Sequence, residues 1–280
     1  MKIRMVVDST ADTTPEVAAR VTVVPLSICF GEQVYIQGVD ITNAEFYEKL
    51  VESDVLPTTS QATPYAFEKV FREAVEAGES VVVITLSESL SGTYQSAVLA
   101  AAEFPGKVFV VDSGTVSIGA GILAEYALRL LDDGFSAEEI AAKLEEQKKR
   151  VHVLAMLDTL EYLKKGGRIS KTVAFAGELL AIKPVLGLDG GEIKILGKAR
   201  GSKQANNLLV KEIQDAGGVD FSYPLLLGYT GLSDVLLQKY IRDSAMLWDK
   251  NREQLPCTLI GSVVGTHAGP GAVAVTFFGK

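Results

Sequence analysis

The sequence predicts an α/β protein of two domains, a mostly parallel sheet first and an α+β domain after it. In the first 150 residues, short runs of β-branched residues alternate with amphipathic helical stretches, as they do in a parallel sheet with crossover helices. Beyond that point hairpin and helix patterns mix instead. Because 280 residues suffice for two domains, we divide the chain into domains at residues 1–150 and 151–280.

The first domain opens with a buried strand at residues 3–7, and a short strand pair then flanks Gly31. Thr42 and Glu45 form a capping-box pattern that starts a helix. A hydroxyl-rich loop follows at residues 56–65. The other elements predicted in this domain are strands at 21–30, 32–36, 80–85 and 107–111 and helices at 42–52, 64–76, 94–102, 118–132 and 136–149.

The second domain opens with a strand at residues 151–157 and a short helix that Gly166 and Gly167 stop. The tight-turn sequence that starts at Asp189 predicts a hairpin. We expect the glycine-rich segment 265–271 to be a loop between two strands. The other elements predicted in this domain are a hairpin over 184–196, strands at 223–229, 259–264 and 273–278, and helices at 160–165, 173–181, 204–216 and 233–249.

Composition narrows the class of protein. Hydrophobic residues make up 48% of the chain and charged residues 22%, which is typical of a soluble globular protein with a sizeable core. The net charge of −8 argues against a nucleic-acid binder. Cys29 and Cys257 are far apart in apolar runs, so we interpret them as buried free thiols in a reducing compartment. No signal peptide or membrane-spanning run is recognised, and we expect a cytoplasmic protein.

The segment from Thr85 to Ala97 is the strongest candidate for a binding site. It joins a run of β-branched residues to an Ala-rich helix through a hydroxyl-rich loop. Backbone N–H groups at the start of a helix attract anions, and Ser91 and Thr93 add hydroxyl donors while Gly92 allows close approach. The segment therefore predicts a site for a carboxylate or phosphate, although a simple helix cap explains the same residues.

Two glycine-rich segments resemble nucleotide-binding motifs but do not satisfy them. Residues 119–124 fit GxGxxA, yet they begin seven residues beyond the preceding strand, so we assign the small residues to close helix packing. Residues 191–198 imitate a P-loop with the wrong glycine spacing, and Ala199 replaces the required Ser or Thr. We therefore expect no ATP site in this chain.

The residue types of a serine hydrolase are present and provide an alternative function. Ser91 and His267 would be the nucleophile and base, with Asp8 or Asp112 orienting the histidine. No GxSxG elbow accompanies them. The other histidine, His152, lies in an apolar strand and is expected to be a core residue.

Positive charge gathers in one part of a chain that is acidic overall. Between Glu161 and Lys203 there are nine basic and four acidic residues. Arg168 and Arg200 both stand beside glycines, and the planar guanidinium suits bidentate binding of phosphate or carboxylate. A solvated basic face is the ordinary explanation of such a run, and an anion site is the functional one.

Taken together, seven short motifs resemble the DegV family, the fatty-acid-binding (FakB-type) component of bacterial fatty acid kinase, almost end to end. The motifs are Val7-Asp-Ser-Thr-Ala-Asp12, Thr59-Ser-Gln61, Leu90-Ser-Gly-Thr-Tyr-Gln-Ser96, Val111-Asp-Ser113, Leu163-Lys-Lys-Gly-Gly-Arg-Ile169, Ile182-Lys-Pro184 and Gly265-Thr-His-Ala-Gly-Pro-Gly271. Ala62 stands where the family often has proline.

The resemblance implies a DegV-like fold of two domains with a lipid tunnel. Hydroxyls matching Thr59 and Ser91 would hold the carboxylate of a long-chain fatty acid, with His267 nearby. Thr93 and the backbone of Ser60 and Gly92 complete the expected carboxylate site. The resemblance assigns Arg168 and Arg200 to phosphate transfer or to docking a kinase partner.

The resemblance also implies a carrier that is not itself an enzyme and that has no cofactor, metal or catalytic residue of its own. An ATP-dependent kinase (FakA-type) would supply ATP and metal and convert the bound fatty acid to acyl phosphate for phospholipid synthesis. Transient membrane contact would serve lipid exchange. A serine hydrolase or thioesterase that uses Ser91 and His267 is the alternative.

Overall fold

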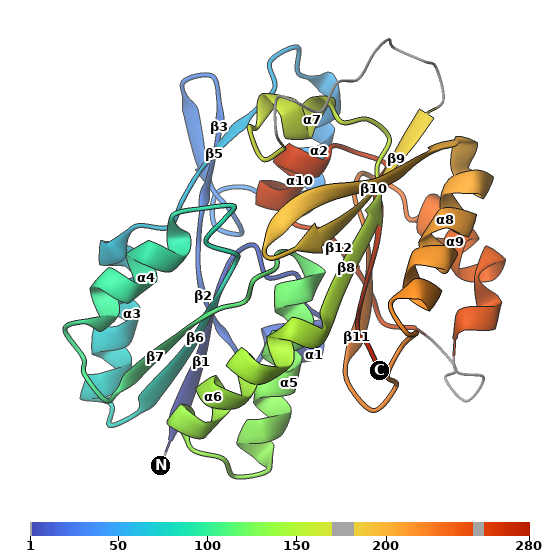
Figure 1. Cartoon of the computed structure of the whole chain (residues 1–280). Helices are drawn as coiled ribbons and strands as arrows, with labels where there is room; N and C mark the ends of the chain where they lie inside the picture. The colour runs from blue at the N-terminus through green and yellow to red at the C-terminus, as the bar shows by residue number, and fades with distance from the viewer. Residues whose placement is uncertain (1, 170–181, 249–254) are drawn as a thin grey trace.

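The computed structural model describes residues 2–169, 182–248 and 255–280 and arranges them around three sheets (Figure 1). The first sheet is parallel, with strand order β2-β1-β6-β7. Its strands are β1 (Ile3–Asp8), β2 (Thr22–Val24), β6 (Ser80–Thr85) and β7 (Val108–Asp112). The predicted parallel sheet of the first half is therefore confirmed.

Two pairs of helices cover the parallel sheet, one pair on each face. Successive side chains of β6 point to opposite faces. Val81 and Val83 pack with α3 (Pro64–Glu76) and α4 (Thr93–Ala101). Val82 and Ile84 pack with α5 (Ile118–Asp132) and α6 (Ala137–Gln147). Both faces of the sheet are therefore buried, which explains the uninterrupted run of β-branched residues.

The second sheet is mixed, with strand order β10-β9-β8-β13-β11-β12, as predicted for an α+β half. Only the β11–β12 pair within it is parallel. Its strands are β8 (Val151–Met156), β9 (Ile182–Asp189), β10 (Glu192–Arg200), β11 (Leu225–Tyr229), β12 (Cys257–Leu259) and β13 (Val273–Phe278). The core side chains of α8 (Gly201–Asp215) and α9 (Val235–Asp243) pack on one face of this sheet.

Helix α5 lies between the two large sheets, where it contacts β1 and β6 on one side and β8, β11 and β13 on the other (Figure 1). Glycines allow this close approach. A Cβ atom on Gly121 would lie 1.9 Å from the carbonyl oxygen of Asp12, and one on Gly119 would lie 2.5 Å from Val153. The assignment of residues 119–124 to close helix packing is confirmed.

The third sheet is small and antiparallel, with strand order β4-β3-β5. Its strands are β3 (Ser27–Phe30), β4 (Gln33–Ile36) and β5 (Thr58–Ser60), and α2 (Asn43–Glu52) packs beside it with the predicted capping box. The predicted strand at 21–30 is divided, because β2 joins the parallel sheet and only β3 pairs with β4. The expected loop at 56–65 contains β5.

The largest error concerns the segment that carries His267. The strand predicted at 259–264 shares only Leu259 with β12. Helix α10 (Ser262–Ala268) occupies the end of that predicted strand and the first part of the glycine-rich segment that was expected to be a loop. The pattern did not reveal this helix because side chains distant in the sequence cap its first turn, as described below. The predicted helix at 233–249 ends at Asp243 and is followed by a short 3₁₀ turn.

Three smaller outcomes complete the comparison. The predicted helix at 173–181 falls outside the described residues. Cys29 and Cys257 are free thiols, as predicted, but half-buried rather than buried. Across the described ranges, every helix is too short or too polar to cross a membrane.

Candidate functional site

A largely apolar cavity lies where the two halves of the chain meet. Its wall draws on β5, on the loops that follow β1, β2 and β6, on α5, on α10 and on the β8, β9 and β13 strands. Leu26, Leu86 and Leu90 come from the first half, and Val153, Leu186 and Val263 come from the second. The polar side chains that line it are Thr10, Thr59, Gln61, Ser91, Ser117, Arg168 and His267.

Thr59 reaches the cavity because of its register in the three-stranded sheet. It pairs with the buried Ile28 of β3. Successive residues of a strand face opposite ways, and Thr58 and Ser60 are both exposed. The Oγ1 of Thr59 and the Nε2 of His267 are 2.9 Å apart in a hydrogen bond whose donor depends on the imidazole tautomer.

Ser91 lies in the loop between β6 and α4. Its Oγ is 2.9 Å from the Oγ1 of the buried Thr93 and accepts a bond from the Thr93 N–H at 3.3 Å. Thr93 in turn accepts a bond from the Ala62 N–H. A Cβ on Gly92 would lie 2.2 Å from the Gln61 side chain. The Thr59 and Ser91 segments are therefore held against each other by direct contacts.

Arg168 follows α7 (Glu161–Lys165), which ends in a Schellman motif. Gly167 has φ +70°, and the N–H groups of Gly167 and Arg168 bond to the carbonyls of Lys164 and Leu163. The guanidinium donates to the carbonyl oxygens of Leu90 at 3.2 Å and of Gly166 at 2.6 Å. These bonds place a permanent positive charge beside the loop that holds Ser91.

His267 occupies the last turn of α10 and is half-buried. Burial, assisted by the nearby charge of Arg168, lowers its pKa to about 4. The imidazole is therefore neutral at pH 7. Its Nδ1 is buried without a hydrogen-bond partner among the described residues. A Cβ on Gly166 would lie 2.1 Å from that atom, so a glycine is needed there.

The predicted site residues divide into two groups. Thr59, Ser91, Arg168 and His267 all line the cavity, although they come from four separate segments. The remaining four do not line it. These are Thr93, which supports Ser91; Gly92, which packs on Gln61; Ser60, which is exposed; and Arg200, the exposed N-cap of α8.

Three polar lining residues were not assigned to the site from the sequence. Gln61 donates to the Ser96 hydroxyl at 3.0 Å, and its neighbour Thr59 was the available signal. Thr10 and Ser117 donate to the buried carboxylates of Asp8 and Asp12. Thr10 lies within the Val7–Asp12 motif, which was the available signal. No local pattern identified Ser117, whose partner Asp12 lies 105 residues away.

The geometry does not favour a serine hydrolase. Ser91 bonds to Thr93, and the bond of His267 is to Thr59. Asp8 accepts bonds from Thr10 and from the Leu86 N–H. Asp112, the other proposed orienter, accepts from backbone N–H groups of its own and the neighbouring loop. Within the described residues, no carboxylate bonds to the Nδ1 of His267.

The remaining candidates are resolved by their surroundings. Residues 191–198 form the turn and strand of the β9–β10 hairpin rather than a phosphate loop. His152 stacks on the buried ring of Phe277 with centroids 5.2 Å apart, but it is half-buried and lies at the edge of the core rather than within it. In the part of the chain that the structure describes, no group of His, Cys, Asp or Glu could hold a metal ion.

Hydroxyl groups, the Gln61 amide, a neutral imidazole and a guanidinium therefore stand at one cavity whose other walls are aliphatic. Hydroxyl and guanidinium groups donate hydrogen bonds to a carboxylate, and a charged partner shortens and strengthens such bonds. The aliphatic walls favour an apolar chain over water. The arrangement suits an amphipathic anion, with its head at these donors and its tail against the walls.

Comparison with known proteins gives consistent results. A family model described as "Uncharacterised protein, DegV family" matches residues 2–280. A DegV domain-containing protein of Caldanaerobacter subterraneus subsp. tengcongensis is 35% identical over 99% of this chain and 98% of its own. A solved DegV family protein from Thermus thermophilus, described by its fatty acid binding, superposes with a TM-score of 0.88 and 35% identity, covering 100% of both chains. A stearic acid-binding protein from Eubacterium ventriosum superposes with a TM-score of 0.86 and 29% identity, covering 99% of this chain and 97% of that one.

The lowered pKa of His267 predicts a pH-dependent stability. Below pH 6.5 the unfolded chain binds a proton at this histidine that the folded chain, with a pKa of about 4, does not bind. The free energy of unfolding therefore decreases as the pH is lowered. When the pH is lowered from 7.5 to 5.5, we expect the free energy of unfolding of the wild type to decrease by about 1 kcal/mol more than that of His267→Gln, whose side chain does not titrate. Urea unfolding at several pH values measures this difference, and equal losses in the two proteins would contradict it.

Proposed function

Because this chain belongs to the DegV family, we propose that it binds a long-chain fatty acid in the cavity between its two halves. The carboxylate bonds to Thr59 and Ser91, with His267 and Arg168 beside it. The acyl chain lies against the aliphatic walls. Its relatives from Thermus thermophilus and Eubacterium ventriosum, described as binding fatty acid and stearic acid, support this assignment.

The observation that carries the proposal is the separation of polar and apolar groups in one cavity. Thr59 and Ser91 come from different segments that direct contacts hold together. Each methylene that leaves water contributes roughly 0.8 kcal/mol, so a long chain supplies affinity and the hydroxyls supply orientation. Because the pKa of His267 is lowered, its neutral ring can donate one hydrogen bond without adding charge.

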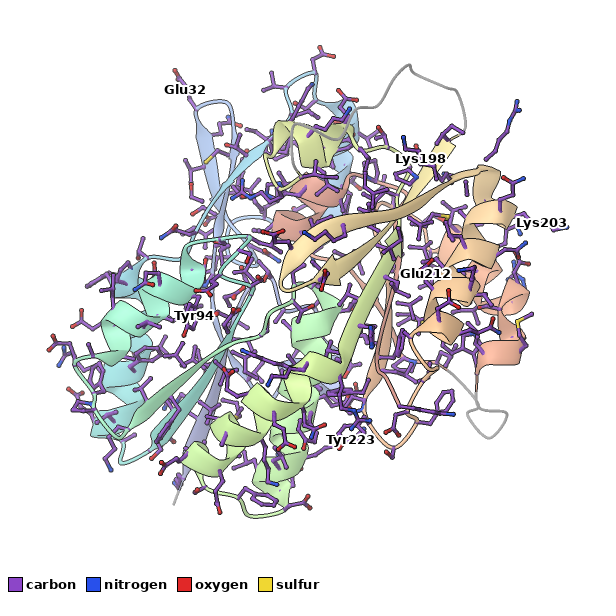
Figure 2. The ribbon with its side chains drawn as sticks, viewed as in Figure 1. Glu32, Tyr94, Lys198, Lys203, Glu212 and Tyr223 are labelled. Atoms are coloured by element: carbon purple, nitrogen blue, oxygen red, sulfur yellow. The ribbon has the colours of Figure 1, made fainter. Side chains whose placement is uncertain are left out.

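We further propose that the bound carboxylate is presented to an ATP-dependent kinase partner of the FakA type. The partner supplies ATP and metal and forms the acyl phosphate used in phospholipid synthesis. Arg168 lies at the cavity and serves charge stabilisation during phosphate transfer. Arg200 lies at the exposed start of α8, between Lys198 of β10 and Lys203 of α8, both of which Figure 2 labels. We assign Arg200 to docking of the kinase partner. Cytoplasmic location and transient membrane contact for lipid exchange belong to the same proposal.

Mass spectrometry of an organic extract tests the binding proposal directly. We expect the purified protein to release near-stoichiometric amounts of a long-chain fatty acid, because an apolar cavity retains such a ligand through purification. An empty extract, together with no uptake of labelled fatty acid by the protein, would overturn the proposal. An esterase assay with wild type and Ser91→Ala would then test the hydrolase alternative.

Adjacent threonines of β5 provide a matched pair of variants. Thr59→Val removes a hydroxyl at the cavity, whereas Thr58→Val makes the same change on the exposed face. Loss of one hydrogen bond to a charged group costs about 1.5–3 kcal/mol, so Thr59→Val should weaken fatty acid binding about 10- to 100-fold. Titration with a labelled fatty acid measures both variants. An equal effect of the two changes would exclude a carboxylate contact at Thr59.

The roles proposed for Arg168 and Arg200 predict that their substitution separates fatty acid binding from acyl phosphate formation. With a FakA-type kinase, ATP and Mg²⁺, we expect Arg168→Ala and Arg200→Ala to retain bound fatty acid but to lose acyl phosphate formation. Raising the kinase concentration should rescue Arg200→Ala, because a docking defect lowers affinity for the partner, and should leave Arg168→Ala inactive. Loss of fatty acid binding in Arg168→Ala would instead place this side chain in the carboxylate site.

A further inference from the structure

The helix that carries His267 is capped by side chains from the other half of the chain. Helix α10 begins after Gly261, and its first backbone N–H groups lack partners within the helix. The Gly261 N–H donates to Asp12 Oδ1 at 2.7 Å and the Ser262 N–H to Asn43 Oδ1 at 3.2 Å. The Val263 N–H donates to Gln37 Oε1 at 3.4 Å. All three acceptors lie more than 200 residues away in the sequence.

Asp12 makes the shortest of these three bonds and is the only acid among the acceptors. Its second oxygen, Oδ2, accepts the hydroxyl proton of Ser117 at 2.6 Å. The side chain is buried, and burial raises its pKa to about 7, with the nearby charge of Asp8 acting in the same direction. The Asp12 carboxyl group is costly to bury, yet it lies between the residues that precede α10 and α5 and bonds to both.

The geometry leaves little freedom at this contact. A Cβ on Gly261 would lie 2.9 Å from Asp12 Oδ1 and 2.3 Å from the Gln37 side chain. A Cβ on Gly265, one turn further along, would lie 2.4 Å from the Tyr47 hydroxyl, which donates to the Ile260 carbonyl oxygen. The helix is therefore held in one position along its axis and in one rotation about it.

A helix of this length transmits position as a rigid rod. His267 lies six residues beyond Gly261, which corresponds to about 9 Å along the axis at 1.5 Å per residue. The intervening residues Val263 and Val264 line the cavity. A displacement of the N-terminal end of α10 therefore moves the imidazole relative to Thr59.

We propose that Asp12 is a positioning residue for the fatty acid site, which holds the His267 imidazole against Thr59 by anchoring the opposite end of α10. The inference rests on the proposed function, because it assigns His267 to the fatty acid carboxylate. Asp12 does not line the cavity and reaches His267 only through α10, while its other carboxylate oxygen holds the hydroxyl of Ser117 at the cavity wall. The last residue of the DegV-like motif from Val7 to Asp12 thus supports the fatty acid site without lining the cavity.

A double-mutant cycle between Asp12 and His267 tests this coupling, with labelled oleic acid as the probe and delipidated protein. His267→Ala and Asp12→Ala should each weaken binding about tenfold, and the double variant should also weaken it about tenfold, because both remove the same contact. A loss of about 100-fold in the double variant would show independent effects and overturn the inference.

Asp12→Asn keeps the test decisive if Asp12→Ala does not fold. Its amide oxygen can accept from Gly261 and its amide nitrogen can donate to Ser117, so both contacts survive without the charge. We expect binding within about threefold of the wild type. A folded Asp12→Asn protein that binds more than about tenfold more weakly would contradict positioning through these hydrogen bonds.

Imidazole resonances separate a failure of this inference from a failure of the proposed function. The chain has two histidines, so a His152→Gln background leaves the signal of His267 alone. In Asp12→Ser, whose side chain is shorter than aspartate and lacks the second oxygen, the pKa of His267 should rise from about 4 toward 6.5 as the helix shifts. An unchanged titration overturns the inference. Unchanged oleic acid binding by His267→Ala instead excludes this carboxylate contact, and the titration still tests positioning.

Discussion

The packing of α5 between the two large sheets is the constraint on which the rest of the structure depends. Its side chains bury against the parallel sheet through Val7 and Val82 and against the mixed sheet through Leu226 and Ala274. Gly121 allows the backbone of Asp12 to approach closely, and Gly119 does the same for the side chain of Val153. Because one helix serves both sheets, the two halves of the chain share a core, and the cavity lies against the N-terminal end of that helix.

The candidate site shows what this shared core makes possible. The hydroxyls come from loops and a short strand of the first half, and the arginine and histidine come from helix ends of the second. Each is placed by backbone geometry that tolerates little change, such as the left-handed Gly167 before Arg168. The apolar walls need only volume and hydrophobicity, whereas the polar end needs atoms within hydrogen-bond reach.

Local signals predicted most of the fold. Helix α2 begins at the capping box of Thr42, α3 begins at Pro64, and the turn after Asp189 makes the β9–β10 hairpin. These elements were recognisable because residues within one or two turns determine them. Helix α10 and strand β5 were missed because α10 is capped by distant side chains and β5 is defined by its pairing with β3.

The sequence by itself determined the family, most of the strands and helices, and four of the polar residues at the cavity. Seven short motifs carry that information, and each lies within a single stretch of chain. Only the tertiary structure decided that Ser60 faces outward, that Arg200 lies outside the cavity that Arg168 lines, and that Asp12 bonds to the first turn of the helix of His267. These outcomes depend on strand register and on contacts across more than 200 residues, and local patterns carry no information about such contacts.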